Sequence, residues 1–264
     1  MNQNNPLVSV IMNCYNSDKY LKEAINSVIS QTYQNWEIIF WDNQSTDKSA
    51  SIVQSYNDKR IKYFYSPKHT LLGEARNLAA ENVSGVWISF LDCDDVWHNN
   101  KLEVQLKDIS NDIGMIYSRM EFLVERSGGE TKIGKSIKNN IYPKRDKLPF
   151  GRVFNKLLYA CFIPLPSVLI KTELFGKVGG IDNSLKVAED YDIFLKVANI
   201  SNVKAIDTVL CKYRVHDNNL SHNNIQTTHE ESIYLVKKYF PNIHAIVSFF
   251  RWNIKYIIKR SLIK

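Results

Sequence analysis

The chain has 264 residues, 44% hydrophobic and 23% charged, with 10 Gly and 7 Pro, which excludes the disordered, collagen-like and low-complexity classes. This length allows one or two domains with a large core and no need for disulfides. The net charge of +7 favours anionic partners, but the basic residues are too dispersed to indicate nucleic acid.

The first half of the sequence alternates short apolar runs with stretches of helical spacing. Strands are predicted at Leu7–Met12, Trp36–Trp41, Ile61–Tyr65 and Val86–Leu91. Between them, helices are predicted from about Tyr20 to Ile29, from a cap at Ser45 or Thr46 to Tyr56, and at Gly73–Asn82. This alternation is typical of βαβ units and predicts a mostly parallel sheet.

The second half is less regular. A hairpin is predicted from Tyr117–Glu125 and Thr131–Ile137, followed by a polar, Pro-containing connection. Helical spacing returns at Phe154–Ala160 and Asp190–Ala198, and two short strands are predicted at Lys204–Ile206 and Val209–Tyr213. We expect one α/β domain whose second half is looser and faces the substrate.

The cysteines and the amino terminus indicate a compartment. Cys14, Cys93, Cys161 and Cys211 lie far apart without a CxxC pair, which favours a reducing environment. Polar residues follow Met1, so no signal peptide is predicted, and no apolar run reaches the roughly 18 residues of a membrane span. The expected location is cytoplasmic, at most peripheral on the inner face of the cell membrane.

Polar residues follow three of the predicted strands, at 13–16, 42–47 and 92–95. Ligands of open parallel sheets bind at the carboxyl ends of the strands, so these three loops are expected to converge. The third loop holds Asp92, Asp94 and Asp95. Such crowding raises carboxylate pKa values unless a cation neutralises the group, and oxygen ligands suit a hard divalent ion. A metal site is predicted, with a solvated acidic turn as the alternative.

An ordered set of segments resembles the family 2 glycosyltransferases. These segments are LVSVIMNCYN, SVISQTY, WDNQSTDKS, GEARN, FLDCDD, a Gly-Gly pair before IDNSL, AEDYD and YRVHDNNLS. The resemblance covers about residues 6–221. It implies the GT-A fold: an α/β class, Rossmann-like, mostly parallel central sheet flanked by helices, with a less regular acceptor-side half and a C-terminal helical tail. The implied domains are 1–221, with donor and acceptor halves at 1–112 and 113–221, and an extension at 222–264.

The resemblance also implies roles for individual residues. The donor nucleotide would be bound by Asn13, Tyr15, Asn16, Asp42, Arg76, Asp92, Asp94, Arg214 and His216. A Mn²⁺ or Mg²⁺ ion would be held by Asp94, Asp95 and His216. Asp190 would be the catalytic base, with Glu189 as the fallback, and the acceptor side would include Trp97 and Ser167. Acids at a helix start are also favoured by the macrodipole alone, so a structural role for Glu189 and Asp190 is the alternative.

The implied reaction is metal-dependent, inverting transfer of a hexosyl or N-acetylhexosaminyl group from a nucleotide-sugar donor. UDP is the commonest donor carrier in the family, although Asn43 and Gln44 replace its usual acid and glycine after Asp42. The acceptor would be a saccharide or lipid-linked glycan, in bacterial surface polysaccharide biosynthesis. The alternative is a catalytically inactive module that binds a nucleotide-sugar or glycan.

Two further segments permit more than one interpretation. Gly129, Gly134, Lys135 and Ser136 match a phosphate-loop pattern, but the sequence predicts no following helix, so we interpret the match as fortuitous. The tail 241–264 is basic and rich in large apolar residues. It predicts an amphipathic helix that either binds an anionic membrane surface or docks on the domain.

Overall fold

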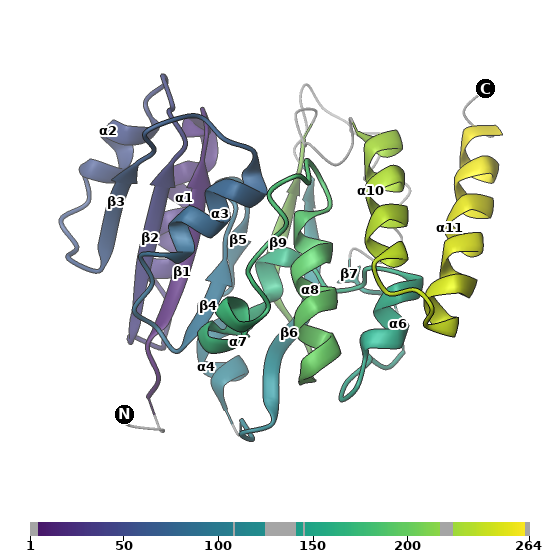
Figure 1. The fold of residues 1–264 in the computed structure, drawn as a ribbon. Helices are drawn as coiled ribbons and strands as arrows, with labels where there is room; N and C mark the ends of the chain where they lie inside the picture. Colours follow the sequence, from purple (N-terminus) through teal and green to yellow (C-terminus); the bar gives the residue numbers. More distant parts are fainter. Residues whose placement is uncertain (1–4, 108, 125–140, 145, 217–223, 262–264) are drawn as a thin grey trace.

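The computed structural model describes residues 5–107, 109–124, 141–144, 146–216 and 224–261. The first half forms the predicted parallel strands, β1 (Val8–Cys14), β2 (Trp36–Asp42), β3 (Ile61–Tyr65) and β4 (Trp87–Phe90). Almost all residues of β1, β2 and β4 are buried, as is typical of central strands covered on both faces. β3 is less buried and forms the outer edge of the sheet (Figure 1).

The second half extends this sheet. The described residues give the strand order β3-β2-β1-β4-β8-β6-β9-β5, with β7 beside β6. β8 (Leu169–Lys171) is antiparallel to both β4 and β6 (Ile113–Val124), and β9 (Asn202–Val215) is parallel to β6. Two short strands, β5 (Val96–Trp97) and β7 (Ile141–Tyr142), complete the sheet. Because β6 and β9 run in the same direction as β4, their carboxyl ends reach the same edge of the sheet.

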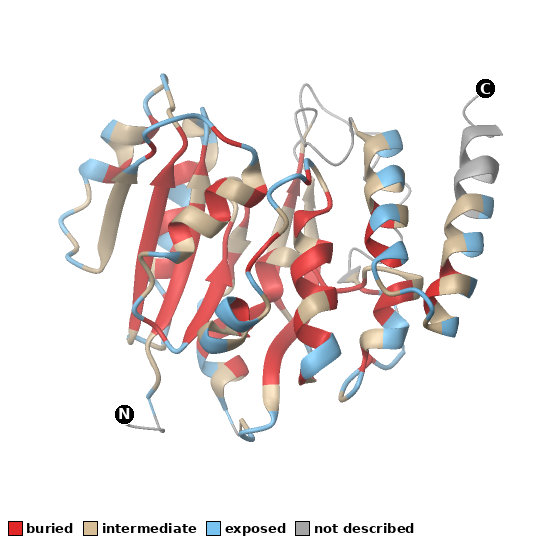
Figure 2. Ribbon diagram, viewed as in Figure 1, coloured by how far each residue is buried: buried red, intermediate tan, exposed pale blue. Residues whose placement is uncertain are grey.

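Side chains alternate along the central strands between two apolar clusters, one on each face. Val10 and Met12 belong to the cluster that includes Leu21 of α1 (Asp18–Ile29), whereas Ile11 belongs to the cluster that includes α3 (Leu72–Ala80). α2 (Ser49–Gln54) and α4 (Lys101–Leu106) pack with the α1 cluster. Figure 2 shows the buried strands between helices whose outer surfaces are exposed.

The helices of the second half cover the α3 face. They are α6 (Phe154–Tyr159), the 3₁₀ turn η1 (Leu165–Ser167), α7 (Thr172–Lys177), α8 (Glu189–Ile200), α10 (Ile225–Lys237) and α11 (Ile243–Ser261). α10 and α11 contribute Leu235, Val236 and Ala245 to the same cluster as α8. The Leu158 carbonyl accepts hydrogen bonds from Ser248 and, at 3.3 Å, from Trp252 Nε1. One face of the tail helix therefore docks on the domain.

Two local expectations differ from the structure, and two others fall on residues that it does not describe. The two short strands predicted near residues 204–213 form one strand, β9, because the pairing passes from Ile206 to Val209 across an irregularity and then continues. α2 begins at Ser49, whose N–H is accepted by Asp47, not by Ser45 or Thr46. The second hairpin strand and the phosphate-loop match lie outside the described residues.

Candidate active site

The three polar loops meet at the carboxyl edge of the sheet, as predicted. β1 pairs with β2 in a register that aligns Cys14 with Asp42, and β4 lies on the other side of β1. The Leu91 N–H donates to the Ile11 carbonyl, which continues this pairing up to the residue before Asp92. The loops after β1, β2 and β4 are therefore neighbours along one edge.

The acidic loop after β4 is the first of two acidic clusters and contains Asp92, Asp94 and Asp95. Asp94 Oδ2 lies 2.9 Å from His216 Nε2, just beyond the end of β9. Asp95 is 1% exposed, and its Oδ1 accepts the Arg214 N–H at 2.8 Å. Burial raises the pKa of Asp94, with repulsion from Asp92 as the next cause, and burial likewise raises the pKa of Asp95. The cluster thus carries an excess of negative charge.

This excess fits a divalent cation. A bound cation would stabilise the ionised form of crowded carboxylates whose pKa is raised. Asp94 and His216 also place an oxygen and a nitrogen ligand side by side. Asp95 Oδ2 is buried without a hydrogen-bond partner. However, no three His, Cys, Asp or Glu side chains in the described ranges are arranged to hold a metal ion by themselves. Oxygens of a substrate would have to complete the coordination, as is common for Mg²⁺.

Arg214 ties the end of β9 to this cluster. Its Nε donates to the Asp94 carbonyl at 2.7 Å, its guanidinium contacts Glu23 of α1, and it lies 4.3 Å from the centre of the Tyr20 ring. The same ring lies 5.6 Å from the imidazole of His216. Tyr20 and Glu23 were not predicted as site residues, because on the sequence they are ordinary positions of an amphipathic helix and Arg214 is 191 residues from Glu23.

Glu189 and Asp190, at the start of α8, form the second acidic cluster. Arg76 of α3 joins the two clusters from a fully buried position: one nitrogen lies 2.5 Å from Glu189 Oε1 and another 2.8 Å from Asp92 Oδ1. Burial raises the pKa of Glu189, while Arg76 acts in the opposite direction. Arg76 is thus committed to two acids of the protein, one from each cluster.

Asp190 is the acid of this pair that forms no ion pair with a described residue. Its Oδ1 accepts the N–H of Tyr191 at 2.6 Å. Burial first, and then repulsion from Glu189, raise the pKa of Asp190 to about 7. A carboxylate that titrates near neutral pH is suited to accept a proton during a reaction.

Gly73 explains how α3 approaches this acid pair so closely. A Cβ atom at Gly73 would lie 3.0 Å from a methyl group of Ile181 and 3.3 Å from the Cβ of Glu189. The absent side chain allows the first turn of α3 to contact the start of α8. Arg76, one turn further along the helix, can then reach Glu189.

The residues after β1 and β2 form a tight polar loop pair. Both oxygens of Asp42, which is fully buried, already accept hydrogen bonds, from the Ser45 N–H and the Tyr63 hydroxyl, each at 2.7 Å. Asn16 has a φ of 50°, and its side-chain oxygen accepts the Thr46 N–H. Asn13 has buried side-chain amide atoms without partners, and Tyr15 is 52% exposed. These loops therefore present Tyr15 to solvent and bury the carboxylate of Asp42.

Two predicted acceptor residues lie elsewhere. Trp97 is 3% exposed because β5 pairs with β9 and places its ring in the α1 cluster, with Lys101 Nζ 3.8 Å from the ring centre. Ser167 is fully buried in η1, and its hydroxyl donates to the Pro164 carbonyl. Both side chains are buried, so the structure gives no support to the expectation that they contact an acceptor.

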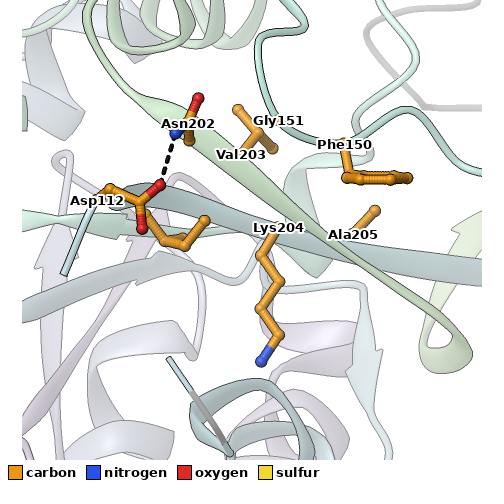
Figure 3. Close-up of a pocket in the computed structure, with 8 residues that line it drawn as sticks. Asp112, Phe150, Gly151, Asn202, Val203, Lys204 and Ala205 are labelled. Atoms are coloured by element: carbon orange, nitrogen blue, oxygen red, sulfur yellow. Dashed lines mark hydrogen bonds between the residues drawn. The ribbon is translucent and has the colours of Figure 1, made fainter. Parts of the chain in front are cut away.

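A shallow depression of about 300 Å³ lies at the opposite edge of the sheet (Figure 3). It is lined by the first residues of β6 and β9 together with Phe150 and Gly151, and Asp112 accepts a hydrogen bond from Asn202 in it. None of the predicted site residues lines it. The polar edge described above therefore remains the candidate active site.

Comparison with known proteins identifies a family. A family model described as glycosyl transferase family 2 matches residues 9–157. An uncharacterized glycosyltransferase of Rickettsia typhi is 36% identical over 224 residues, 82% of this chain and 67% of the relative. WfgD of Escherichia coli, a UDP-Glc:alpha-D-GlcNAc-diphosphoundecaprenol beta-1,3-glucosyltransferase, is 32% identical over 82% of this chain and 80% of its own length.

Solved structures show the same architecture. Staphylococcus aureus TarS in complex with UDP-GlcNAc has a TM-score of 0.67 at 18% identity, over 92% of this chain and 70% of that one. The mannosyltransferase PcManGT of Pyrobaculum calidifontis, with GDP-Man and Mn²⁺, has a TM-score of 0.66 at 16% identity, over 97% of this chain and 75% of that one. The chain therefore belongs to glycosyl transferase family 2, as an enzyme with the GT-A fold.

Proposed function

We propose that this glycosyltransferase moves a sugar from a UDP-sugar donor to a hydroxyl of a saccharide or lipid-linked saccharide, with inversion at the anomeric carbon. The observation that supports this reaction best is the Arg76 bridge. It links the charged loop Asp92–Asp95 to the pair Glu189–Asp190, so that a diphosphate site and a base adjoin at one edge of the sheet.

Asp190 is the proposed catalytic base. An acceptor hydroxyl is a poor nucleophile, and a carboxylate that removes its proton while the bond to the anomeric carbon forms contributes about 10² to 10⁴ in rate. The proton moves to the Asp190 carboxylate as the bond between the anomeric carbon and the diphosphate oxygen breaks. The pKa of about 7 keeps a substantial fraction of Asp190 ionised at neutral pH. Glu189 is held by Arg76 and remains the fallback.

Arg214 and His216 are proposed to face the leaving diphosphate. Hydrogen bonds to Asp94 and Asp95 fix this end of β9 against the acidic loop. The hydrogen-bond donors of Arg214 and His216 would therefore be oriented before negative charge develops on the diphosphate. A Mn²⁺ or Mg²⁺ ion would be held by Asp94 and His216, with Asp95 as the third candidate. When bound, such an ion neutralises charge that develops on the diphosphate oxygens.

We also propose that the two halves of the domain bind different substrates. We assign donor binding to residues 1–112, acceptor binding to 113–221 and a helical extension to 222–264. The donor site would be formed by Asn13, Tyr15, Asn16, Asp42, Arg76 and Asp92. Two facts support a UDP-sugar: the name of the WfgD relative contains UDP-Glc, and TarS was solved with UDP-GlcNAc. Asp42 and Arg76 are buried, so they would act mainly by shaping the loops that contact the nucleotide.

We also propose that α11 rests on an anionic membrane surface. No helix within the described residues is long and apolar enough to cross a bilayer. However, α11 exposes a second apolar stripe on the face that is not docked, namely Ile243, Val247, Phe250 and Ile254. The segment 241–264 contains five basic residues and no acid. Apolar side chains beside cations suit the boundary of an anionic bilayer. A diphosphoundecaprenol acceptor, like the one in the name of WfgD, would be found there.

Donor binding and transfer test the main proposal together. We expect UDP-glucose to raise the melting temperature of the wild type more with Mn²⁺ than without it, because a ligand of the folded state stabilises that state. Asp94→Ala should lose the Mn²⁺-dependent increment, whereas Asp112→Ala, at the remote depression, should keep it. Binding without transfer, with several donors and acceptors, would instead favour the inactive binding module.

Vesicle sedimentation tests the membrane proposal. The double variant Val247→Ser/Phe250→Ser should sediment less with vesicles that contain phosphatidylglycerol than the wild type does. Phe150→Ser, at a residue that is 74% exposed and lines the depression rather than belonging to α11, is the matched control and should sediment like the wild type. Equal sedimentation of all three proteins would contradict the proposal.

A further inference from the structure

The segment 182–188 leads directly into the acid pair at the start of α8. It follows two glycines with positive φ, Gly179 and Gly180, and its Asn183, Ser184 and Lys186 are exposed. Leu185 and Ala188 of this segment are buried in the same apolar cluster as α8 and hold it by packing. The hydrogen bonds to the segment add directional constraints close to the first turn of α8, which carries Asp190.

Glu231 of α10 holds the last part of this segment. Its carboxylate accepts three successive backbone N–H groups, from Lys186 at 2.8 Å, Val187 at 3.0 Å and Ala188 at 2.9 Å. Successive amides that point at one anion form a strong, directional site, because each hydrogen bond has a charged acceptor. The last of these amides belongs to the residue just before Glu189.

Tyr234 of α10 and Lys238, the residue just after α10, hold the beginning of the segment. Lys238 Nζ lies 2.6 Å from Asp182 Oδ2, and the Tyr234 hydroxyl donates to the same oxygen at 3.1 Å. Burial raises the pKa of Asp182, but the hydrogen bonds from Lys238 and Ser184 outweigh this effect and lower it. Positions 231, 234 and 238 are three and four residues apart, so they lie on one stripe of the helix.

We propose that Glu231 is a positioning residue for the transfer reaction, which it serves by fixing the peptide units 186–188 and through them the orientation of Asp190. This inference rests on the proposed function of Asp190 as the base. It adds an element that the family model does not include, since that match ends at residue 157 and α10 starts at Ile225.

The rest of α8 is held independently of Glu231. Tyr191 donates to the carbonyls of Leu157 and Leu158, and Asp192 forms an ion pair with Lys196 at 2.6 Å. Arg76 holds Glu189 from the other side. Loss of the Glu231 carboxylate should therefore leave α8 folded and disturb mainly the peptide units before it. A base displaced by a fraction of an ångström loses much of its effect on rate.

The test compares Glu231→Gln with Glu230→Gln. Both variants remove one negative charge from α10, but Glu230 is exposed and accepts only from Gln226 among the hydrogen bonds of the described residues. The probes are UDP-glucose with Mn²⁺ and GlcNAc diphosphate on a short polyprenol. We expect Glu231→Gln to lower kcat about ten- to hundredfold, with donor Kd within twofold of the wild type. Glu230→Gln should match the wild type in both quantities.

Two results would overturn the proposal. One is an unchanged kcat in Glu231→Gln. The other is a parallel loss of kcat, donor affinity and Tm, which would indicate a purely structural role. Tyr234→Phe provides a second, milder variant that removes one hydrogen bond to Asp182 and should lower kcat less than Glu231→Gln does. Asp190→Asn separates the two proposals: if it retains full transfer activity, the assignment of the base fails whatever Glu231 does.

Discussion

The two acidic clusters of the site differ in how their charges are compensated. In the loop after β4, Asp94 and Asp95 contact groups at the end of β9, and burial, followed by repulsion from neighbouring aspartates, raises the pKa of both. At the start of α8, Glu189 is paired with Arg76 while Asp190 forms no ion pair with a described residue. The first cluster needs more positive charge, and the second leaves one acid available to take up a proton.

This difference indicates separate roles for clusters of similar composition. Surplus negative charge beside His216 and Arg214 suits a metal ion and a diphosphate, because the ion removes the repulsion. A single carboxylate with a pKa near neutrality suits proton transfer. Arg76 contacts one acid of each cluster, so it holds the two proposed functions close together.

The largest expected effect is the loss of the base. Asp190→Asn removes the proton acceptor at nearly constant volume, so we expect kcat to fall about 10²- to 10⁴-fold while donor Kd stays within a few-fold. Transfer and calorimetric donor binding measure the two quantities. Asp112→Asn, at the remote depression, is the control. If Asp190→Asn instead weakened donor binding and left kcat intact, the contrast between the clusters would be wrong.

Removal of the Arg76 guanidinium should lower the free energy of unfolding. Arg76→Met leaves Glu189 and Asp92 without their cation, and breaking a buried ion pair typically costs about 3 to 5 kcal/mol in the free energy of unfolding. Lys68→Met removes an ion pair to Glu74 from a side chain that is 68% exposed, and it should cost less than about 1 kcal/mol. Urea denaturation of both variants gives these values. A similar cost for both would show that the bridge does not hold the clusters together.

The pH dependence of kcat tests whether Asp190, in the second acidic cluster, takes up the proton. As the proposed base, Asp190 would act only when ionised, and its pKa is raised to about 7. Transfer at saturating donor and Mn²⁺ should therefore fall toward tenfold per pH unit below pH 7 and level off above it. The residual activity of Asp190→Asn should lack this inflection. A wild-type rate that is flat between pH 5.5 and 7 would contradict the assignment of the base.

The sequence predicts the elements whose physical signal is local. The strands at Trp36–Trp41 and Ile61–Tyr65 and the helix after Gly73 follow from apolar periodicity, and the structure confirms them within a few residues. The convergence of the loops after β1, β2 and β4 follows from parallel pairing. For this reason, the acidic edge of the sheet could be predicted without any tertiary contact.

Contacts between distant segments could not be predicted in this way. Arg76 is 113 residues from Glu189, and no local pattern indicates that the Arg76 guanidinium is paired with acids of the protein itself. Trp97 follows the acidic loop and was expected at the acceptor side, but its pairing with Cys211 buries it. The contacts of Glu231 depend on how α10 packs. Tertiary packing decides which of several plausible polar residues is free to act.

The last expected effect concerns a buried amine that forms no ion pair with an acid among the described residues. Lys101 is fully buried, with Ser89 Oγ at 3.3 Å and the Trp97 ring nearby, and burial lowers its pKa to about 7. Between pH 7 and about 10 the unfolded chain binds this proton more tightly than the folded one, so stability should rise by up to about 1.4 kcal/mol per pH unit. Lys101→Met should abolish this increase and leave the protein at least as stable at pH 7. Parallel unfolding curves at pH 7 and pH 9 measure both changes, with Lys68→Met as the matched control. If stability rose with pH as steeply in Lys101→Met as in the wild type, the rise would not come from Lys101. The charge of Lys101 would then be compensated within the fold, as the charge of Glu189 is compensated by Arg76.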